Sequence, residues 1–175
     1  MDIKIVHPDA TYAAVLAELG ARLFAETFSD DNPPDDLKSF LESTYTLEIQ
    51  TQELNNPNVY TYMAYDAKDD TVPLAFCQLR QNKKVYEFRG DPEALELQRI
   101  YVDKRWAGKG VGKKLLNECI KKAEELGKKT IWLGVWENNL SAIKFYRNQG
   151  FCMVGTHTFQ IGDKLDTDEI MVKHL

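Results

Sequence analysis

A short run of glycines and basic residues has the composition of a phosphate-binding turn. Residues 105–113 read RWAGKGVGK, with glycines at positions 108, 110 and 112. Glycine lets the main chain turn tightly and approach a ligand without obstruction from a Cβ atom. A helix is predicted directly after the run, and the free amides at a helix start attract anions. The run therefore predicts a site for a phosphate or a pyrophosphate. Four cations add positive charge to it: Arg105, Lys109, Lys113 and Lys114.

The spacing of this glycine turn excludes two kinds of nucleotide site. A P-loop needs a glycine where Ala107 stands, and a serine or threonine where Lys114 stands to hold magnesium. A dinucleotide fingerprint needs a glycine at Lys113 and an acidic residue at the end of a following strand. Neither condition is met. The turn is left with another phosphate ligand, or with no ligand and solvated lysines.

A second motif, at residues 139–151, favours one ligand. It reads NLSAIKFYRNQGF, and with Arg105-x-x-Gly108-x-Gly110 it resembles the GCN5-related N-acetyltransferase (GNAT) superfamily. The runs AETFSDDNPPDDLKSFLE, LELQRIYV, IWLGVWENN and GDKLDTDEIMVKHL are similar to the PaiA-type spermidine/spermine N-acetyltransferase group within it. The likeness covers most of the chain and is weakest across residues 66–91.

The resemblance implies an α/β fold and a coenzyme. Superfamily members have a mixed, mostly antiparallel central sheet flanked by helices, with two splayed parallel strands, here residues 95–102 and 130–135. An acyltransferase of this kind moves an acetyl group from acetyl-CoA to a primary amine by direct attack in a ternary complex, without a metal. The pyrophosphate would lie on the amides of the glycine turn, and the pantetheine arm would pair with residues 100–102. An N–H of that strand would stabilise the oxyanion of the tetrahedral intermediate. The coenzyme-binding residues implied are Ile100, Tyr101, Val102, Arg105, Trp106, Ala107, Gly108, Lys109, Gly110, Val111, Gly112, Lys113, Asn139 and Tyr146.

Two side chains are candidates for proton transfer. We expect Tyr146 to protonate the departing thiolate, a step uphill by about 2 kcal/mol because phenols have a pKa near 10 and thiols near 8.5. Glu96 shares a strand face with Gln98 and is the candidate base, directly or through a water molecule. Each residue has a structural alternative: Tyr146 as a core aromatic, Glu96 as a solvated charge, and Asn139 as a helix N-cap.

Carboxylates after the first predicted helix suggest an acceptor. Residues 29–36 read SDDNPPDD, and Glu26, Asp30 and Asp31 are the candidate acceptor-binding residues. Clustered carboxylates attract polycations such as spermidine or spermine, although acidic loops are also commonly just solvated. The same chemistry on a protein N-terminus, a lysine, an amino acid or an amino sugar stays open. A non-catalytic acyl-CoA sensor is a further alternative.

Hydrophobic periodicity predicts the elements that position these residues. We expect strands at residues 3–6, 59–65, 74–79, 95–102, 130–135, 152–161 and 168–174. We expect helices at residues 12–28, from about 37 to 45 and beyond, from 111 until Gly127, and at 140–149. A strand, glycine turn, helix and strand in succession imply a parallel crossover, and the paired strands of the tail imply antiparallel pairing. The sheet should therefore be mixed.

Composition limits the class of protein. The chain has 175 residues and a net charge of −5, from 22 Lys plus Arg against 27 Asp plus Glu. One domain over residues 1–175 is expected, and the acidic balance argues against a nucleic-acid partner. A mean hydropathy of −0.43, with no apolar run of about 20 residues, argues against a membrane span.

Location and assembly are read from weaker signals. The start MDIKIVHPDA lacks a secretory signal, and Cys77, Cys119 and Cys152 share no close spacing. We therefore expect a cytoplasmic protein with reduced thiols. The three histidines are scattered, so no metal site is expected. Many members of the superfamily dimerise, and a homodimer is compatible with the resemblance.

Overall fold

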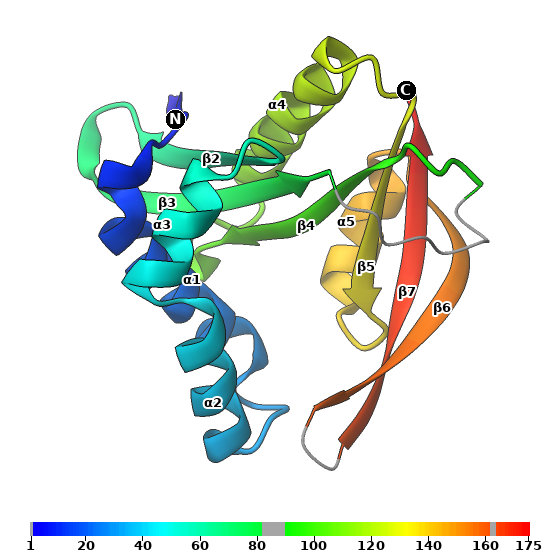
Figure 1. The fold of residues 1–175 in the computed structure, drawn as a ribbon, viewed down its shortest axis with the longest axis horizontal. Helices are drawn as coiled ribbons and strands as arrows, with labels where there is room; N and C mark the ends of the chain where they lie inside the picture. Colours follow the sequence, from blue (N-terminus) through cyan, green and yellow to red (C-terminus); the bar gives the residue numbers. More distant parts are fainter. Residues whose placement is uncertain (1, 82–89, 162–163) are drawn as a thin grey trace. The chain divides into compact units, whose positions relative to one another are not determined.

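The computed structural model describes residues 2–81, 90–161 and 164–175. Its seven-stranded sheet has the strand order β1-β2-β3-β4-β5-β7-β6 (Figure 1). By its internal contacts the chain forms two compact units, which are described separately. Unit 1 comprises residues 1–78 and 99–118, and unit 2 comprises residues 79–98 and 119–175. Strands β3 and β4 and helix α4 contribute residues to both units.

Unit 1 begins with β1 (Ile3–Val6), a 3₁₀ turn η1 (Ala10–Tyr12) and α1 (Ala13–Phe28). Strand β1 has its predicted bounds, and it pairs antiparallel with β2 (Val59–Asp66). Strand β3 (Asp69–Arg80) follows after a short turn and begins five residues before the predicted start at residue 74.

The helical segment between α1 and β2 differs from the prediction. The single helix expected from about residue 37 is two helices, α2 (Pro34–Thr44) and α3 (Leu47–Asn55). Helix α2 begins early because proline suits the first turn, where a backbone N–H has no partner. The chain then restarts as α3 because Thr46 is its N-cap, with Oγ1 accepting a hydrogen bond from Ile49 N at 3.2 Å.

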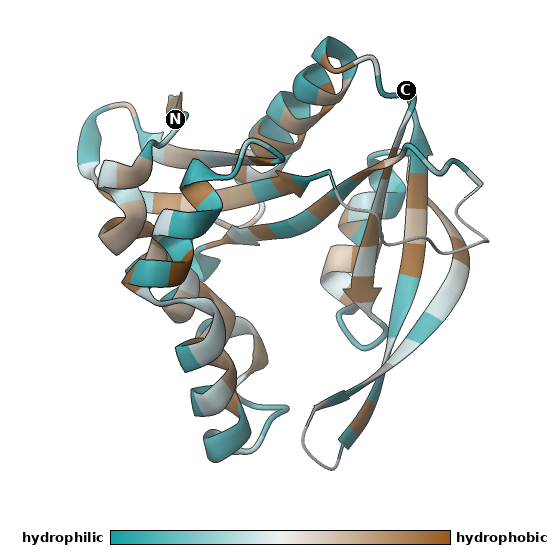
Figure 2. Ribbon diagram, in the orientation of Figure 1, coloured by the Kyte–Doolittle hydropathy of each residue, from teal (hydrophilic) through white to brown (hydrophobic). Residues whose placement is uncertain are grey.

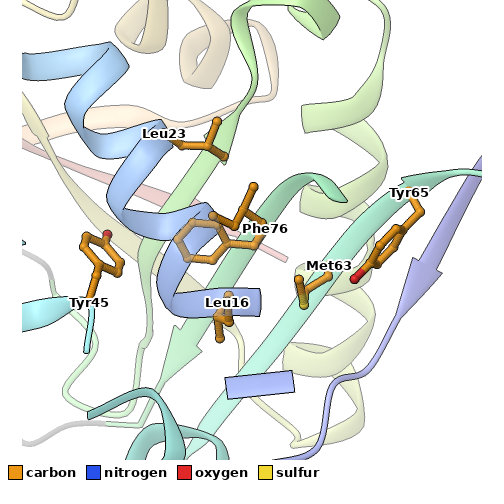
Figure 3. Close-up of a cluster of buried hydrophobic side chains, with 7 residues drawn as sticks. Leu16, Leu23, Tyr45, Met63, Tyr65 and Phe76 are labelled. Carbon is orange, nitrogen blue, oxygen red and sulfur yellow. The ribbon is translucent and has the colours of Figure 1, made fainter. Parts of the chain in front are cut away.

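The core of unit 1 lies between α1 and the strands. Leu16 and Leu23 of α1 pack with Met63 of β2, Phe76 of β3 and Tyr45, all of them buried (Figure 3). Full burial of each such side chain stabilises the fold by about 1.5–3 kcal/mol relative to exposure. This packing fixes α1 against the sheet.

Strand β4 (Leu95–Val102) has its predicted bounds and leads through η3 (Lys104–Trp106) to α4 (Val111–Glu125). Along α4, hydrophobic and hydrophilic residues alternate with the helical period (Figure 2). Gly127, with φ of +67°, follows the helix and ends it where the sequence predicts.

Unit 2 contains β5 (Thr130–Trp136), α5 (Leu140–Asn148), β6 (Cys152–Ile161) and β7 (Lys164–His174). Strand β5 pairs along its length with β7, antiparallel, and β7 pairs antiparallel with β6. Strand β7 begins four residues before the predicted start at Asp168.

The parallel pairing predicted between β4 and β5 is confirmed, and it is short. Among the described residues it joins Leu95 to Ile131 and Glu96 to Trp132. Trp132 also belongs to the core of unit 2, where it packs with Ala94 and with Ile170 of β7. The sheet is therefore mixed, as the sequence predicts.

Candidate active site

The glycine turn of residues 105–113 is open in unit 1. Gly108 and Gly110 have φ angles of +74° and +84°, which side chains other than glycine rarely adopt. A Cβ atom added at either glycine would meet no atom within 4 Å. The main chain here is therefore accessible to a ligand, as the sequence predicts.

The turn also offers hydrogen-bond donors. Among the described residues, no backbone carbonyl accepts from the N–H groups of Gly108, Gly110, Gly112 or Lys113. The first intrahelical bond of α4 is made by Lys114 N, which donates to Gly110 O at 3.0 Å. Free N–H groups at a helix start carry a partial positive charge, so they suit a phosphate oxygen.

The cations of the turn are not all available to a ligand. Lys113 and Lys114 are exposed, and the ammonium of Lys109 lies over the ring of Trp106, 4.6 Å from its centroid. Arg105 already has a partner within the protein, because its guanidinium folds back onto Asp103. Arg105 Nε donates to Asp103 Oδ1 at 2.9 Å, and Nη2 donates to Oδ2 at 2.6 Å.

Sequence reasoning missed Asp103 and its second partner, Arg22. Arg22 Nη1 of α1 donates to Asp103 Oδ2 at 2.8 Å and to Glu26 Oε1 at 2.9 Å. Hydrogen bonds from the two guanidinium groups, that of Arg105 first, hold the pKa of Asp103 well below its usual range. The local sequence does contain one signal: an aspartate that directly follows a predicted strand is a common N-cap of the helical turn after it.

Residues 100–102 lie on the part of β4 that belongs to unit 1, and all three are half-buried. The ring of Tyr101 is packed among aromatic rings, 5.8 Å from that of Phe76, 6.1 Å from that of Phe24 and 6.4 Å from that of Phe28. Tyr101 is thus tied to α1 and β3 by its side chain.

A buried ion pair lies one residue before this segment. Arg99 Nη1 donates to Glu53 Oε2 of α3 at 2.7 Å and to Gln78 Oε1 of β3 at 2.9 Å. The Arg99 guanidinium also lies over the ring of Tyr45, 5.3 Å from its centroid. Burial raises the pKa of Tyr45 to about 12. Sequence reasoning missed this cluster, because Glu53 and Arg99 lie 46 positions apart.

The candidate acceptor residues of unit 1 have different environments. Glu26 is half-buried and forms an ion pair with Arg22, whereas Asp30 and Asp31 are exposed just after α1. Asp35 and Asp36 lie in the first turn of α2, where carboxylates stabilise the helix dipole. Asp30, Asp31 and Asp35 are thus the exposed carboxylates of this segment.

In unit 2, Asn139 is the N-cap of α5. Its Oδ1 accepts from Ala142 N at 3.3 Å and from Ser141 Oγ at 3.2 Å. In the described part of the chain, its Nδ2 group makes no hydrogen bond. The capping role is therefore present, and the Nδ2 group is left to donate to a ligand.

Tyr146 and Glu96 also belong to unit 2. Tyr146 of α5 is 7% exposed, and its ring lies 5.3 Å from that of Phe145 and 5.6 Å from that of Phe151. Glu96 is half-buried on β4 opposite Trp132. Gln98, two residues along β4, has a buried Oε1 with no hydrogen-bond partner in the described ranges. This packing fits the alternative role of Tyr146 as a core aromatic residue. The same packing keeps bulk water away from the ring.

Two absences concern the described residues alone. Within residues 2–81, 90–161 and 164–175, no group of three or more His, Cys, Asp or Glu side chains is placed to hold a metal ion. Among the helices of the same ranges, none is long and apolar enough to cross a membrane.

Comparison with known families gives a match over most of the chain. Residues 18–151 match the family model described as Acetyltransferase (GNAT) family. An uncharacterized N-acetyltransferase in the pepI 3′ region of Lactobacillus delbrueckii subsp. lactis is 33% identical over 99% of this chain and 98% of its own length.

Two further relatives carry more specific names. Spermine/spermidine N(1)-acetyltransferase of Bacillus subtilis (strain 168) is 42% identical over 80 residues, which are 45% of this chain and 49% of that protein. The crystal structure of PaiA N-acetyltransferase from Thermoplasma acidophilum, in complex with coenzyme A, covers 100% of both chains with a TM-score of 0.78 and 22% identity. That likeness extends to the whole fold.

Proposed function

Because the chain belongs to the GNAT family of acetyl-CoA-dependent N-acetyltransferases, we propose that it acetylates a primary amine of a polyamine such as spermidine or spermine. The observation that supports the site most directly is the open glycine turn with unpaired amides at the start of α4. The polyamine is supported by the partial likeness to the Bacillus subtilis enzyme, by the fold shared with PaiA, and by the exposed Asp30 and Asp31.

The glycine turn binds the pyrophosphate of acetyl-CoA in this proposal. The N–H groups of Gly108, Gly110 and Gly112 donate to phosphate oxygens, and the helix dipole of α4 adds attraction. Lys109, Lys113 and Lys114 supply full positive charges, whereas the charge of Arg105 is already paired with Asp103.

The backbone of residues 100–102 pairs with the pantetheine arm, and one of its N–H groups donates to the thioester oxygen. Such a donor is worth a few kcal/mol once the oxygen becomes an oxyanion, about 10²–10³ in rate. The Nδ2 group of Asn139 also donates to the pantetheine arm.

Proton transfer is assigned to two side chains of unit 2. A free alkyl amine with a pKa of about 10.4 is neutral only about once in 2,500 molecules at pH 7, so the reaction needs a proton acceptor. Glu96 accepts that proton, directly or through a water molecule. The amine nitrogen first forms the new C–N bond, and Tyr146 then donates its hydroxyl proton to the coenzyme A thiolate as the C–S bond of the tetrahedral intermediate breaks.

A thiol-release assay tests this function. Acetyl-CoA is offered with spermine, spermidine, amino acids, amino sugars and peptides, and we expect the highest kcat/KM with a polyamine. Turnover of another amine and not of polyamines would contradict the polyamine acceptor. Binding of acetyl-CoA without turnover of any amine would indicate a sensor.

The variant Tyr146→Phe tests the acid. It keeps the ring packed between Phe145 and Phe151 and removes only the hydroxyl. We expect kcat to fall about tenfold or more, with KM for acetyl-CoA little changed. The matched control is Tyr60→Phe in unit 1, which should keep wild-type turnover. An unchanged kcat for Tyr146→Phe would contradict the role of the acid.

A further inference from the structure

Asp103 is the junction between β4, the glycine turn and α1. Its side chain is 2% exposed, and Arg105 and Arg22 donate to its carboxylate. Its main chain is bonded on both sides: Asp103 N donates to Leu74 O of β3 at 2.9 Å, and Trp106 N donates to Asp103 O at 2.8 Å. Asp103 thus ties the start of the turn to β3 and to α1 at once.

The carboxylate also shapes the first turn of η3. Asp103 Oδ1 accepts from Arg105 N at 2.9 Å, so the side chain is the N-cap of η3. The Asp103 carboxylate thus accepts from both the backbone N–H and the guanidinium of Arg105. The bonds to the guanidinium are the stronger ones, because hydrogen bonds between charged groups are about twice as strong as neutral ones. Both the side chain and the main chain of Asp103 therefore contact the residues that lead into Gly108.

The charges around Asp103 cancel. We call Glu26, Arg22, Asp103 and Arg105 the turn cluster; it contains two carboxylates and two guanidinium groups, joined in sequence by ion pairs. A balanced cluster adds little net attraction for an anion. Replacing Asp103 by a neutral residue would leave the cluster positive, which by charge alone should strengthen anion binding. A loss of binding would instead indicate a role in geometry.

We propose that Asp103 is a positioning residue for the coenzyme: it holds the glycine turn in the conformation whose amides receive the pyrophosphate, and Arg22 anchors that conformation to α1. This inference rests on the proposed binding of acetyl-CoA at the glycine turn. Asp103 touches neither the substrate nor the reacting atoms in this assignment, and it acts through the backbone that it caps.

Two acetyl donors test the inference. Acetyl-CoA carries the pyrophosphate, whereas S-acetylpantetheine has the same thioester and no pyrophosphate. For Asp103→Asn we expect kcat/KM to fall about tenfold with acetyl-CoA and less than twofold with S-acetylpantetheine. Arg22→Met, which keeps the pairing of Asp103 with Arg105, should show the same selectivity with a smaller loss. Equal losses with both donors, or no loss with acetyl-CoA, would overturn the proposal.

Calorimetric titration with CoA separates this inference from the proposed function. Asparagine keeps an oxygen that can accept from Arg105 N but loses the ion pairs with Arg22 and Arg105 that fix this cap in place, so Asp103→Asn should fold, and its circular dichroism spectrum should match the wild type. We expect its Kd for CoA to rise about tenfold, and a Kd equal to or below that of the wild type would overturn the inference. Wild-type binding without turnover of any amine would contradict only the proposed function. Asp69→Asn, which alters a similar cap of Thr71 N in an exposed turn, is the control and should bind CoA as the wild type does.

Discussion

The part of β4 that belongs to unit 1 is held near both ends by charged side chains, but the two groups are built differently. Near its start lies what we call the core cluster, Glu53, Arg99 and Gln78, whose ion pair is nearly buried, with 13% and 11% of the side chains exposed. Just after its end lies the turn cluster, where Arg105 is 72% exposed and Arg22 36% exposed.

Because the two clusters differ in burial, we expect the core cluster to contribute mainly to stability and the turn cluster mainly to the geometry of the ligand site. Removing one partner of a buried pair leaves an uncompensated charge, which costs several kcal/mol. In the turn cluster the two arginines are more exposed, and both pair with the buried Asp103, so the loss of either arginine leaves that carboxylate with one cation and should cost less stability. The core cluster is therefore expected to hold α3, β3 and β4 together, while the turn cluster mainly orients a loop. Variants in the core cluster should therefore lower the free energy of unfolding, and variants in the turn cluster should mainly weaken coenzyme binding.

The largest effect is expected from Arg99→Met in the core cluster. The variant leaves the Glu53 carboxylate buried without its cation, and we expect the free energy of unfolding to fall by about 3–5 kcal/mol. Urea denaturation measures this loss. The double variant Arg99→Met with Glu53→Leu should recover much of it, because no buried charge remains. A loss below about 1 kcal/mol would mean that the core cluster behaves like an exposed one.

The next effect is expected at alkaline pH, from Tyr45 beside the core cluster. Its pKa is raised to about 12 by burial, from about 10 in an unfolded chain. The folded state therefore favours the neutral phenol, and this stabilisation is present below pH 10 and is lost as the pH rises toward 12. The expected loss is about 2–3 kcal/mol, measured by urea denaturation across this range. Tyr45→Phe should remove this loss of stability, whereas Tyr60→Phe should retain it.

A smaller effect is expected from Gly110→Ala in the glycine turn. A Cβ atom has open space there, so the cost is the positive φ of +84°, about 1–2 kcal/mol. If the turn relaxes to a negative φ, its amides lose their direction and KM for acetyl-CoA should rise several-fold. Gly127→Ala has a similar φ and open space after α4, so it should lose similar stability with an unchanged KM. Equal KM effects in the two variants would remove the turn from coenzyme binding.

The smallest effect is expected from the exposed carboxylates after α1. The double variant Asp30→Asn with Asp31→Asn should raise KM for spermine roughly twofold at low salt, because exposed charges act mainly by steering. The effect should disappear at about 1 M salt, where screening is nearly complete. Glu124→Gln with Glu137→Gln changes the net charge equally in unit 2 and should leave KM unchanged. An identical rise in both double variants would indicate only an effect of net charge.

Local patterns in the sequence predicted the parts of the molecule that depend on neighbours along the chain. Strands β1 and β4 have their predicted bounds because alternation and adjacent turns mark them. The division between α2 and α3 was missed, since the cap at Thr46 was not recognised in a segment that otherwise favours helix. The glycine turn was predicted with its open backbone, because positive φ angles require glycine.

Local sequence patterns could not predict contacts between residues that lie far apart in the sequence. Arg22 and Asp103 lie 81 positions apart, and their pairing follows from the packing of α1 against the sheet. The sequence predicts that Arg105 contacts a phosphate, and its pairing with a buried carboxylate two residues earlier was not foreseen. The roles of Tyr146 and Glu96 stay predictions, because their chemistry depends on a bound acceptor.

The position of Trp106 makes its intrinsic fluorescence a probe of the glycine turn. The three tryptophans have separate environments: Trp132 is buried, Trp136 donates to Asp166, and Trp106 lies half-exposed beneath the ammonium of Lys109. An anion arriving at the neighbouring amides would draw that ammonium away from the indole face. The contribution of Trp106 to the total tryptophan emission should then change with occupancy, so coenzyme binding can be followed without a label.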